Sequence, residues 1–161
     1  MSGKFDSRIP VLIASSLKPA KDTRAYGKLG LSLRETGLYR LSFMGFSQFP
    51  IENCEDENFY SSFSKTNSAW GRISSQVRFL RILLKVRPKI LICCTYEYLP
   101  IASFFKGILG YNLVYDVQEN YVKNLDLNPS LSPNKKAKLS RIIRQMERVN
   151  RIDLFLLAEK C

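Results

Sequence analysis

The sequence contains no histidine, and its four cysteines include no pair in Cys-x-x-Cys spacing. Zinc sites in proteins are built mostly from these two residue types, so the sequence predicts no metal site. Without histidine, the usual base that activates a cysteine nucleophile is also missing. We therefore interpret the adjacent Cys93 and Cys94, which end an apolar segment, as small buried hydrophobic residues.

Long apolar runs are also absent. No run approaches the roughly 20 residues that a membrane-spanning helix needs. The first residues lack the charged and then apolar order of a secretory signal. The sequence therefore predicts a cytoplasmic domain whose thiols are reduced.

The loop at residues 16–22, which follows the first apolar segment, lacks the two common phosphate-binding motifs. It contains neither Gly-x-Gly-x-x-Gly nor the glycines and lysine of a P-loop. Backbone amides approach a pyrophosphate closely only where such glycines permit it. We therefore predict no bound dinucleotide and no other cofactor.

What is present is the composition of an ordinary folded domain, with 45% hydrophobic and 24% charged residues in a chain of 161. Basic residues outnumber acidic ones by 25 to 14, for a net charge of +11, and residues 70–161 hold 16 of the basic residues but only 7 of the acidic ones. This excess of positive charge attracts phosphate groups on nucleic acid, anionic lipid or a phosphorylated ligand. Charge alone does not distinguish among these three partners.

Short apolar segments rich in branched residues alternate with helical patterns along the chain. The first of them, residues 9–15, is nearly continuous, as expected for a strand buried on both faces of a sheet. The predicted strands are residues 9–15, 39–45, 89–94, 112–117 and 153–157. The predicted helices are residues 22–37, 70–87, 100–110 and 134–151. This alternation predicts an α/β fold, a single Rossmann-like domain over residues 1–161 with a doubly wound, mostly parallel sheet of about five or six strands and helices on both faces.

Two glycines and a proline mark the ends of predicted helices. Gly37 and Gly110 stand where a left-handed residue commonly ends a helix, and Pro88 stops the helix before it. Within residues 70–87, apolar side chains recur at helical spacing. This stripe consists of Ile73, Val77, Leu80 and Leu84. Residues 46–69 form a polar and aromatic stretch to which we assign no element.

Polar side chains follow three of the predicted strands. Ligands of open parallel sheets bind beyond the carboxyl ends of the strands, so the loops at residues 15–22, 94–98 and 117–123 are the expected site. In the first loop, Lys18, Lys21 and Arg24 can meet an anionic acceptor near the start of a helix. The alternative is a basic turn that contacts only solvent.

Three carboxylates occupy the other two loops. Glu97, Asp116 and Glu119 can orient sugar hydroxyls or accept a proton from one, which makes them the candidate catalytic residues. The alternative for Asp116 is that it binds backbone amides of its own loop.

The predicted helix at residues 134–151 is strongly basic, and only Glu147 opposes its cations. A solvated helix face explains this pattern, and attraction to an anionic membrane surface is the main alternative. If the helix is attracted to such a surface, the protein would lie peripherally at the inner membrane surface. The cations are Lys135, Lys136, Lys138, Arg141, Arg144, Arg148 and Arg151.

Two segments resemble the N-terminal domain of GT-B glycosyltransferases of the family-four, group-one kind. Residues 99–102 (Leu-Pro-Ile-Ala) and 115–121 (Tyr-Asp-Val-Gln-Glu-Asn-Tyr) are similar to the family's Leu-Pro-x-Ala and Asp-x-His-Glu-x-Tyr patterns. Residues 17–19, 22–24 and 32–37 are similar to its first loop and helix. Gln118 replaces the histidine of the motif and Cys94 replaces another, which leaves no imidazole at either position.

The resemblance implies the acceptor-binding half of an enzyme that transfers a sugar, of the hexosyl type, from a nucleotide-sugar to an acceptor hydroxyl, with retained configuration and without a metal. It implies a glycan or lipid-linked acceptor and a role in polysaccharide biosynthesis. The nucleotide-sugar would bind a C-terminal domain that this chain does not include, so we expect the chain alone to be inactive. The residues expected to contact the acceptor are Lys18, Asp22, Arg24, Gln118 and Asn120.

The main alternative is a non-enzymatic binding module that docks nucleic acid or protein through the helices at residues 70–87 and 134–151. No nucleic-acid motif supports it, and under the glycosyltransferase interpretation we expect no nucleic acid as partner. A self-sufficient small-molecule enzyme is a third interpretation, which the missing cofactor motif disfavours.

Overall fold

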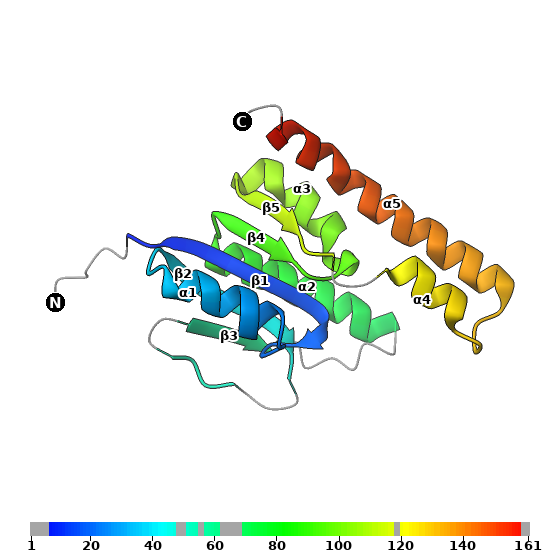
Figure 1. The fold of residues 1–161 in the computed structure, drawn as a ribbon, viewed down its shortest axis with the longest axis horizontal. Coiled ribbons are helices and arrows are strands. Elements are labelled where there is room, and N and C mark those ends of the chain that lie inside the picture. The colour runs from blue at the N-terminus through cyan, green and yellow to red at the C-terminus, as the bar shows by residue number, and fades with distance from the viewer. Residues whose placement is uncertain (1–6, 48–50, 55–56, 62–68, 118–119, 159–161) are drawn as a thin grey trace.

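The computed structural model describes residues 7–47, 51–54, 57–61, 69–117 and 120–158. Within them, five strands form one sheet in the order β3-β2-β1-β4-β5, and every neighbouring pair is parallel. Figure 1 shows the strands side by side, with α1 in front of the sheet and α2 behind it. The strands are β1 (Ile9–Pro19), β2 (Tyr39–Phe46), β3 (Glu57–Ser61), β4 (Ile90–Cys93) and β5 (Asn112–Tyr115). The predicted Rossmann-like α/β fold is confirmed.

Seven helical segments connect or follow the strands in the described residues. Between β1 and β2 a π-helical turn leads directly into a short α-helix, and between β4 and β5 a 3-10 turn leads into a longer one. The segments are η1 (Ala25–Gly30), α1 (Leu31–Glu35), α2 (Ala69–Val86), η2 (Tyr96–Tyr98), α3 (Leu99–Leu109), α4 (Tyr121–Leu127) and α5 (Pro133–Ala158). In Figure 1, α5 runs outside α3 at the β5 edge of the molecule.

Alternate residues of the strands contribute to two separate cores, one on each face of the sheet. On one face, Leu12 and Ala14 of β1 pack with Phe79 of α2 and Leu99 of α3. On the other face, Val11 and Ile13 pack with residues of the η1 and α1 segment. This alternation follows from the two-residue period of a strand. It places α2 and α3 on the same side of the sheet.

Four of the five predicted strands are confirmed as β1, β2, β4 and β5, and Cys93 and Cys94 are fully buried as predicted. The predicted strand at residues 153–157 is wrong, because these residues belong to the end of helix α5. No glycine or proline separates them from the basic helix, so the helix continues through them. A short apolar run alone does not distinguish a strand from a buried helix segment.

Strand β3 lies in the stretch to which the sequence assigned no element. Its first residues, Glu57 and Asn58, have low strand propensity, yet the strand pairs with β2 from Leu41↔Glu57 onward. Glu57 is 2% exposed, and its carboxylate accepts hydrogen bonds from Tyr26 Oη and Arg34 Nη1, both at 3.2 Å. Partners on distant elements therefore make a polar edge strand possible.

The predicted helix ends are confirmed. Gly37 and Gly110 have φ values of +67° and +68°, in the left-handed region that favours glycine, and α2 ends just before Pro88. The predicted helix at residues 22–37 is present as η1 followed by α1. Helix α4 was not predicted, and the side chain of Asn120 caps its start by accepting a hydrogen bond from the Lys123 amide at 3.0 Å.

The apolar stripe that the sequence predicts for α2 is not the face of the helix that packs against the core. The residues of α2 that face the core are Ser75, Phe79, Ile82 and Leu83. Phe79 stacks on Tyr98 with ring centroids 4.3 Å apart, and Ser75 Oγ and Tyr98 Oη are 2.8 Å apart. The stripe with Ile73, Val77 and Leu84 faces outward instead.

Candidate functional site

The strand order of the sheet reverses between β1 and β4, and two buried hydroxyl residues join the strands at that point. Ser16 Oγ lies 3.0 Å from Thr95 Oγ1, and the Ser16 amide donates a hydrogen bond to the same oxygen at 3.2 Å. Ser16 and Thr95 are 1% and 0% exposed. Because ligands of doubly wound sheets bind where the strand order reverses, this pair marks the floor beneath the candidate site.

Above this floor, Arg24 and Asp116 form a bidentate ion pair between the loops that follow β1 and β5. Arg24 Nη2 lies 2.7 Å from Asp116 Oδ1, and Arg24 Nε donates to Oδ2 at 3.2 Å. The hydrogen bond to Asp116 raises the pKa of the guanidinium. Since β4 lies between β1 and β5 in the sheet, the pair spans the carboxyl end of β4.

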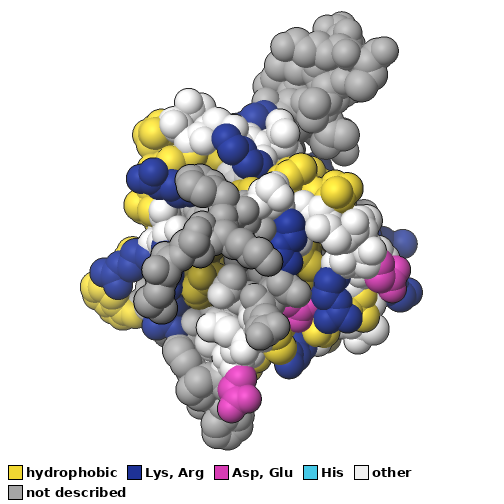
Figure 2. Space-filling model, turned by 90° about the vertical axis from the view of Figure 1, so that its left-hand side faces the viewer, with side chains coloured by type: hydrophobic (Ala, Val, Ile, Leu, Met, Phe, Trp, Pro, Cys, Tyr) yellow, Lys and Arg dark blue, Asp and Glu magenta, His cyan; other side chains and the backbone are white. Residues whose placement is uncertain are grey.

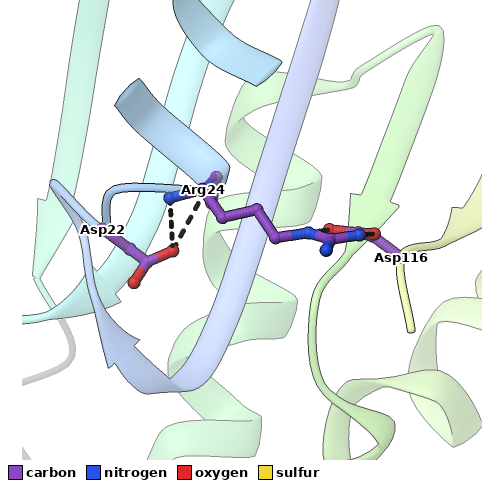
Figure 3. Close-up of polar contacts among 4 residues, drawn as sticks. Asp22, Arg24 and Asp116 are labelled. Atoms are coloured by element: carbon purple, nitrogen blue, oxygen red, sulfur yellow. Dashed lines mark hydrogen bonds and ion pairs between the residues drawn. The ribbon is translucent and has the colours of Figure 1, made fainter. Parts of the chain in front are cut away.

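Backbone contacts hold both partners of this ion pair in place. Asp22 Oδ2 accepts hydrogen bonds from the amides of Arg24 and Ala25, each at 3.1 Å. The Asp116 amide donates to the carbonyl of Cys93 at 2.9 Å, which extends the pairing of β4 with β5 by one residue. Figure 3 shows the side chain of Arg24 reaching toward Asp116 while Asp22 turns back to the backbone. Asp22 therefore acts as a positioning residue for Arg24.

A hollow of about 470 Å³ lies beside the ion pair. It combines two cations, two hydroxyl groups and one carboxylate around one apolar side chain, and its volume falls within the ordinary range of small-molecule sites. The lining residues are Thr23, Arg24, Lys28, Leu29, Ser32 and Asp116. Such a surface offers donors and acceptors to sugar hydroxyls and a positive charge to an anionic group.

Of the residues predicted for the site, the structure brings Arg24 and Asp116 together and places Asp22 against the backbone of Arg24. The residues that line the hollow in the described chain do not include Lys18, Glu97 or Asn120. The predicted residues Gln118 and Glu119 lie outside the described residues.

The other predicted residues have separate contacts. The Lys18 amide binds Ser15 Oγ at 3.1 Å. The Glu97 carbonyl accepts a hydrogen bond from Gln76 Nε2 at 2.8 Å, and Asn120 caps α4. The ammonium of Lys21 lies 5.0 Å from the centre of the Phe59 ring, on the β3 side and away from the hollow.

Sequence reasoning missed four residues of the hollow, Thr23, Lys28, Leu29 and Ser32. A signal for two of them is present, because Arg24, Lys28 and Ser32 recur every four residues beside the apolar series Ala25, Leu29 and Leu33. Only the loop before this helical segment was considered at the sequence level. The helix itself contributes half of the lining.

Two tyrosines join the loops that follow β4 and β5. The rings of Tyr96 and Tyr121 meet edge to face with centroids 4.8 Å apart. Burial raises the pKa of Tyr96. Tyr121 belongs to the segment that carries the family resemblance, so this contact ties that segment to the neighbouring loop.

A second and larger hollow, of about 860 Å³, lies along α5 next to Asp126 of α4. Lys136 Nζ binds the Asp126 carbonyl at 2.7 Å and thereby joins the two helices. Four cations line this hollow, and they are Lys136, Arg141, Arg144 and Arg148. The hollow therefore suits an anionic ligand.

Positive charge extends over other surfaces of the molecule. The side at which β1 begins, seen in Figure 2, has more Lys and Arg than Asp and Glu side chains on its described surface. Of the helices in the described ranges, each is too short or too polar to cross a lipid bilayer.

Comparison of the sequence with protein-family models and with curated proteins finds no match.

Proposed function

We propose that this chain is the acceptor-binding domain of a GT-B glycosyltransferase that transfers a sugar from a nucleotide-sugar to an acceptor hydroxyl. The observation that carries the proposal is the Arg24–Asp116 pair beside a polar hollow at the carboxyl edge of a parallel sheet. The resemblance of residues 115–121 to the family motif includes Asp116 itself. The sequence resemblance and the geometry of the hollow therefore both support a role for Asp116.

In this proposal the acceptor binds in the hollow with a hydroxyl group at Asp116. A carboxylate accepts hydrogen bonds from sugar hydroxyls, and the planar guanidinium of Arg24 fixes the direction of that carboxylate. Lys28 and Ser32 contact the remainder of the acceptor, with Lys28 favouring an acceptor that carries an anionic group.

During transfer, the oxygen of the acceptor hydroxyl forms the new bond to the anomeric carbon, and the bond from that carbon to the nucleotide diphosphate breaks. The hydroxyl proton leaves toward a base, for which Asp116 is one candidate of this chain. A second domain would bind the nucleotide-sugar and stabilise the charge that develops on the diphosphate. Among the described cysteines, Cys54, Cys93 and Cys94 form no disulfide, as expected for the cytoplasmic enzyme that we propose.

The proposal is tested by titrating the chain with a panel of neutral and anionic oligosaccharides while amide resonances are followed by NMR. We expect shifts at residues 22–32 and at Asp116 for at least one sugar. Arg24→Gln should weaken that binding by about tenfold, as expected for the loss of a charged hydrogen-bonding group. Lys138→Gln is the matched control, because it removes one exposed cation that does not line the hollow.

Sugars that shift only resonances elsewhere, or Arg24→Gln binding as tightly as the unchanged chain, would argue against this function. Sugar transfer by this chain without a second domain would contradict its assignment as half of an enzyme.

A second candidate function, a non-enzymatic module that binds a polyanion, is supported by the basic hollow along α5. Binding of an oligonucleotide that weakens steeply with salt and is lost in Arg141→Gln/Arg144→Gln, together with no response to any sugar, would favour it.

A further inference from the structure

Helix α2 carries an apolar stripe that faces away from the protein core. Trp70 is 81% exposed, Ile73 is 55% exposed, and Val77 and Leu84 are each 44% exposed. Steps of three, four and seven residues place these side chains along one line of the helix, roughly opposite the face that packs on the sheet. A single exposed apolar residue needs no explanation, but an aligned series of large ones marks an interaction surface.

Helix α3 adds two more exposed apolar side chains on the same side of the sheet. Phe104 is 69% exposed and Ile108 is 63% exposed. They are four residues apart, and the opposite face of α3 buries Leu99 and Ala102 in the core shared with α2. We name the exposed apolar residues of both helices the outer face, which consists of Trp70, Ile73, Val77, Leu84, Phe104 and Ile108.

The charged residues of α2 and α3 all have one sign. Neither α2 nor α3 contains an aspartate or a glutamate. On α2, Arg81 and Lys85 are exposed beside the stripe on one flank. An apolar stripe with a tryptophan, bordered by Lys and Arg, is the pattern of a helix that lies in the interface of a membrane.

We infer that the outer face docks on the surface of an anionic lipid bilayer. The apolar side chains would enter the region between headgroups and acyl chains, while Arg81 and Lys85 contact lipid phosphates. A second copy of the chain fits this surface poorly, because facing outer faces would bring cations of both copies together without acidic partners on either helix. The inference does not depend on the proposed function, since α2 and α3 contribute no residue to the hollow at Arg24.

Trp70 is the only tryptophan in the chain, so its fluorescence reports directly on the outer face. We expect its emission to shift to shorter wavelength and to lose accessibility to a water-soluble quencher when vesicles of phosphatidylglycerol and phosphatidylcholine are added. Vesicles of phosphatidylcholine alone should give a much smaller change. High salt should weaken the binding to the anionic vesicles, because it screens the cations.

Vesicle co-sedimentation of substituted proteins measures how much the apolar residues and the cations of the outer face each contribute to binding. Ile73→Gln/Val77→Gln should reduce binding by at least tenfold through loss of apolar burial. Arg81→Gln/Lys85→Gln should reduce it by about fivefold for each charge removed. The matched control is Leu38→Gln, which changes an exposed apolar residue between α1 and β2 and should leave binding unchanged. Far-UV circular dichroism checks that each variant retains its helices.

Three outcomes would overturn the inference. The first is unchanged Trp70 emission with anionic vesicles. The second is a shift that grows with protein concentration in the absence of lipid, which would assign the outer face to a second copy. The third is vesicle binding that survives Ile73→Gln/Val77→Gln but is lost in Arg141→Gln/Arg144→Gln, which would assign lipid binding to α5.

Discussion

Asp22 sets the position of Arg24 through two backbone hydrogen bonds at the start of η1. Replacing Asp22 with alanine leaves two amides without this acceptor, so we expect the free energy of unfolding to fall by about 1 kcal/mol. Asp22→Asn keeps a side-chain oxygen at the same place and should retain most of that free energy. Urea denaturation of the three proteins measures the difference.

The same substitution tests whether Asp22 acts through Arg24. If it does, Asp22→Ala should weaken sugar binding while Asp22→Asn preserves it, because only the alanine variant releases the backbone at residue 24. Equal weakening in both variants would instead indicate that the charge of Asp22 contacts the acceptor directly.

At the level of the element, replacing either of two glycines of α3 with alanine should have opposite effects on stability. Gly110 ends α3 with φ at +68°, whereas Gly107 lies inside the same helix, and a Cβ at either position would meet no atom within 4 Å. Only backbone conformation therefore distinguishes the two sites. Gly110→Ala should destabilise the protein by about 1 kcal/mol, and Gly107→Ala should stabilise it by about 0.5–1 kcal/mol.

Thermal unfolding followed by circular dichroism gives both values under one set of conditions. A stabilising Gly110→Ala variant would contradict the left-handed end of α3, and a destabilising Gly107→Ala variant would contradict the helical, open position of residue 107.

At the level of the whole molecule, buried tyrosines make stability depend on alkaline pH. Burial raises the pKa of Tyr98 and Tyr111, whose hydroxyls pair with Ser75 and with the Ala102 carbonyl. In the unfolded chain these groups ionise near the ordinary tyrosine value of about 10, while in the folded chain they stay protonated at that pH. The unfolded state therefore loses protons first, and the free energy of unfolding should fall as the pH rises above about 10.

Urea denaturation at about pH 8 and at about pH 11 measures this fall. In Tyr111→Phe one contributing group is removed, so the decrease between the two pH values should be smaller than in the unchanged chain. An equal decrease would show that other groups, such as lysines, cause the alkaline loss of stability.

Strands β1, β2, β4 and β5 were predictable because each lies in a short, mainly apolar segment that alternates with helical patterns along the chain. Strand β3 was not predictable, since burial of Glu57 depends on hydrogen bonds from Arg34 of α1 and Tyr26 of η1. Residues 153–157 show the converse error, because an apolar run was assigned to a strand although the preceding helix continues through it.

For the candidate site, the sequence by itself determined that polar residues follow the strands at one edge of a parallel sheet, since the alternation of strand and helix leaves few other arrangements. Only the tertiary structure decided that Arg24 pairs with Asp116, 92 residues away along the chain, and that Lys28 joins them. It also decided which apolar stripe of α2 is buried. Local patterns show that a side chain is polar or apolar, but the packing of distant elements decides which partner or surface that side chain meets.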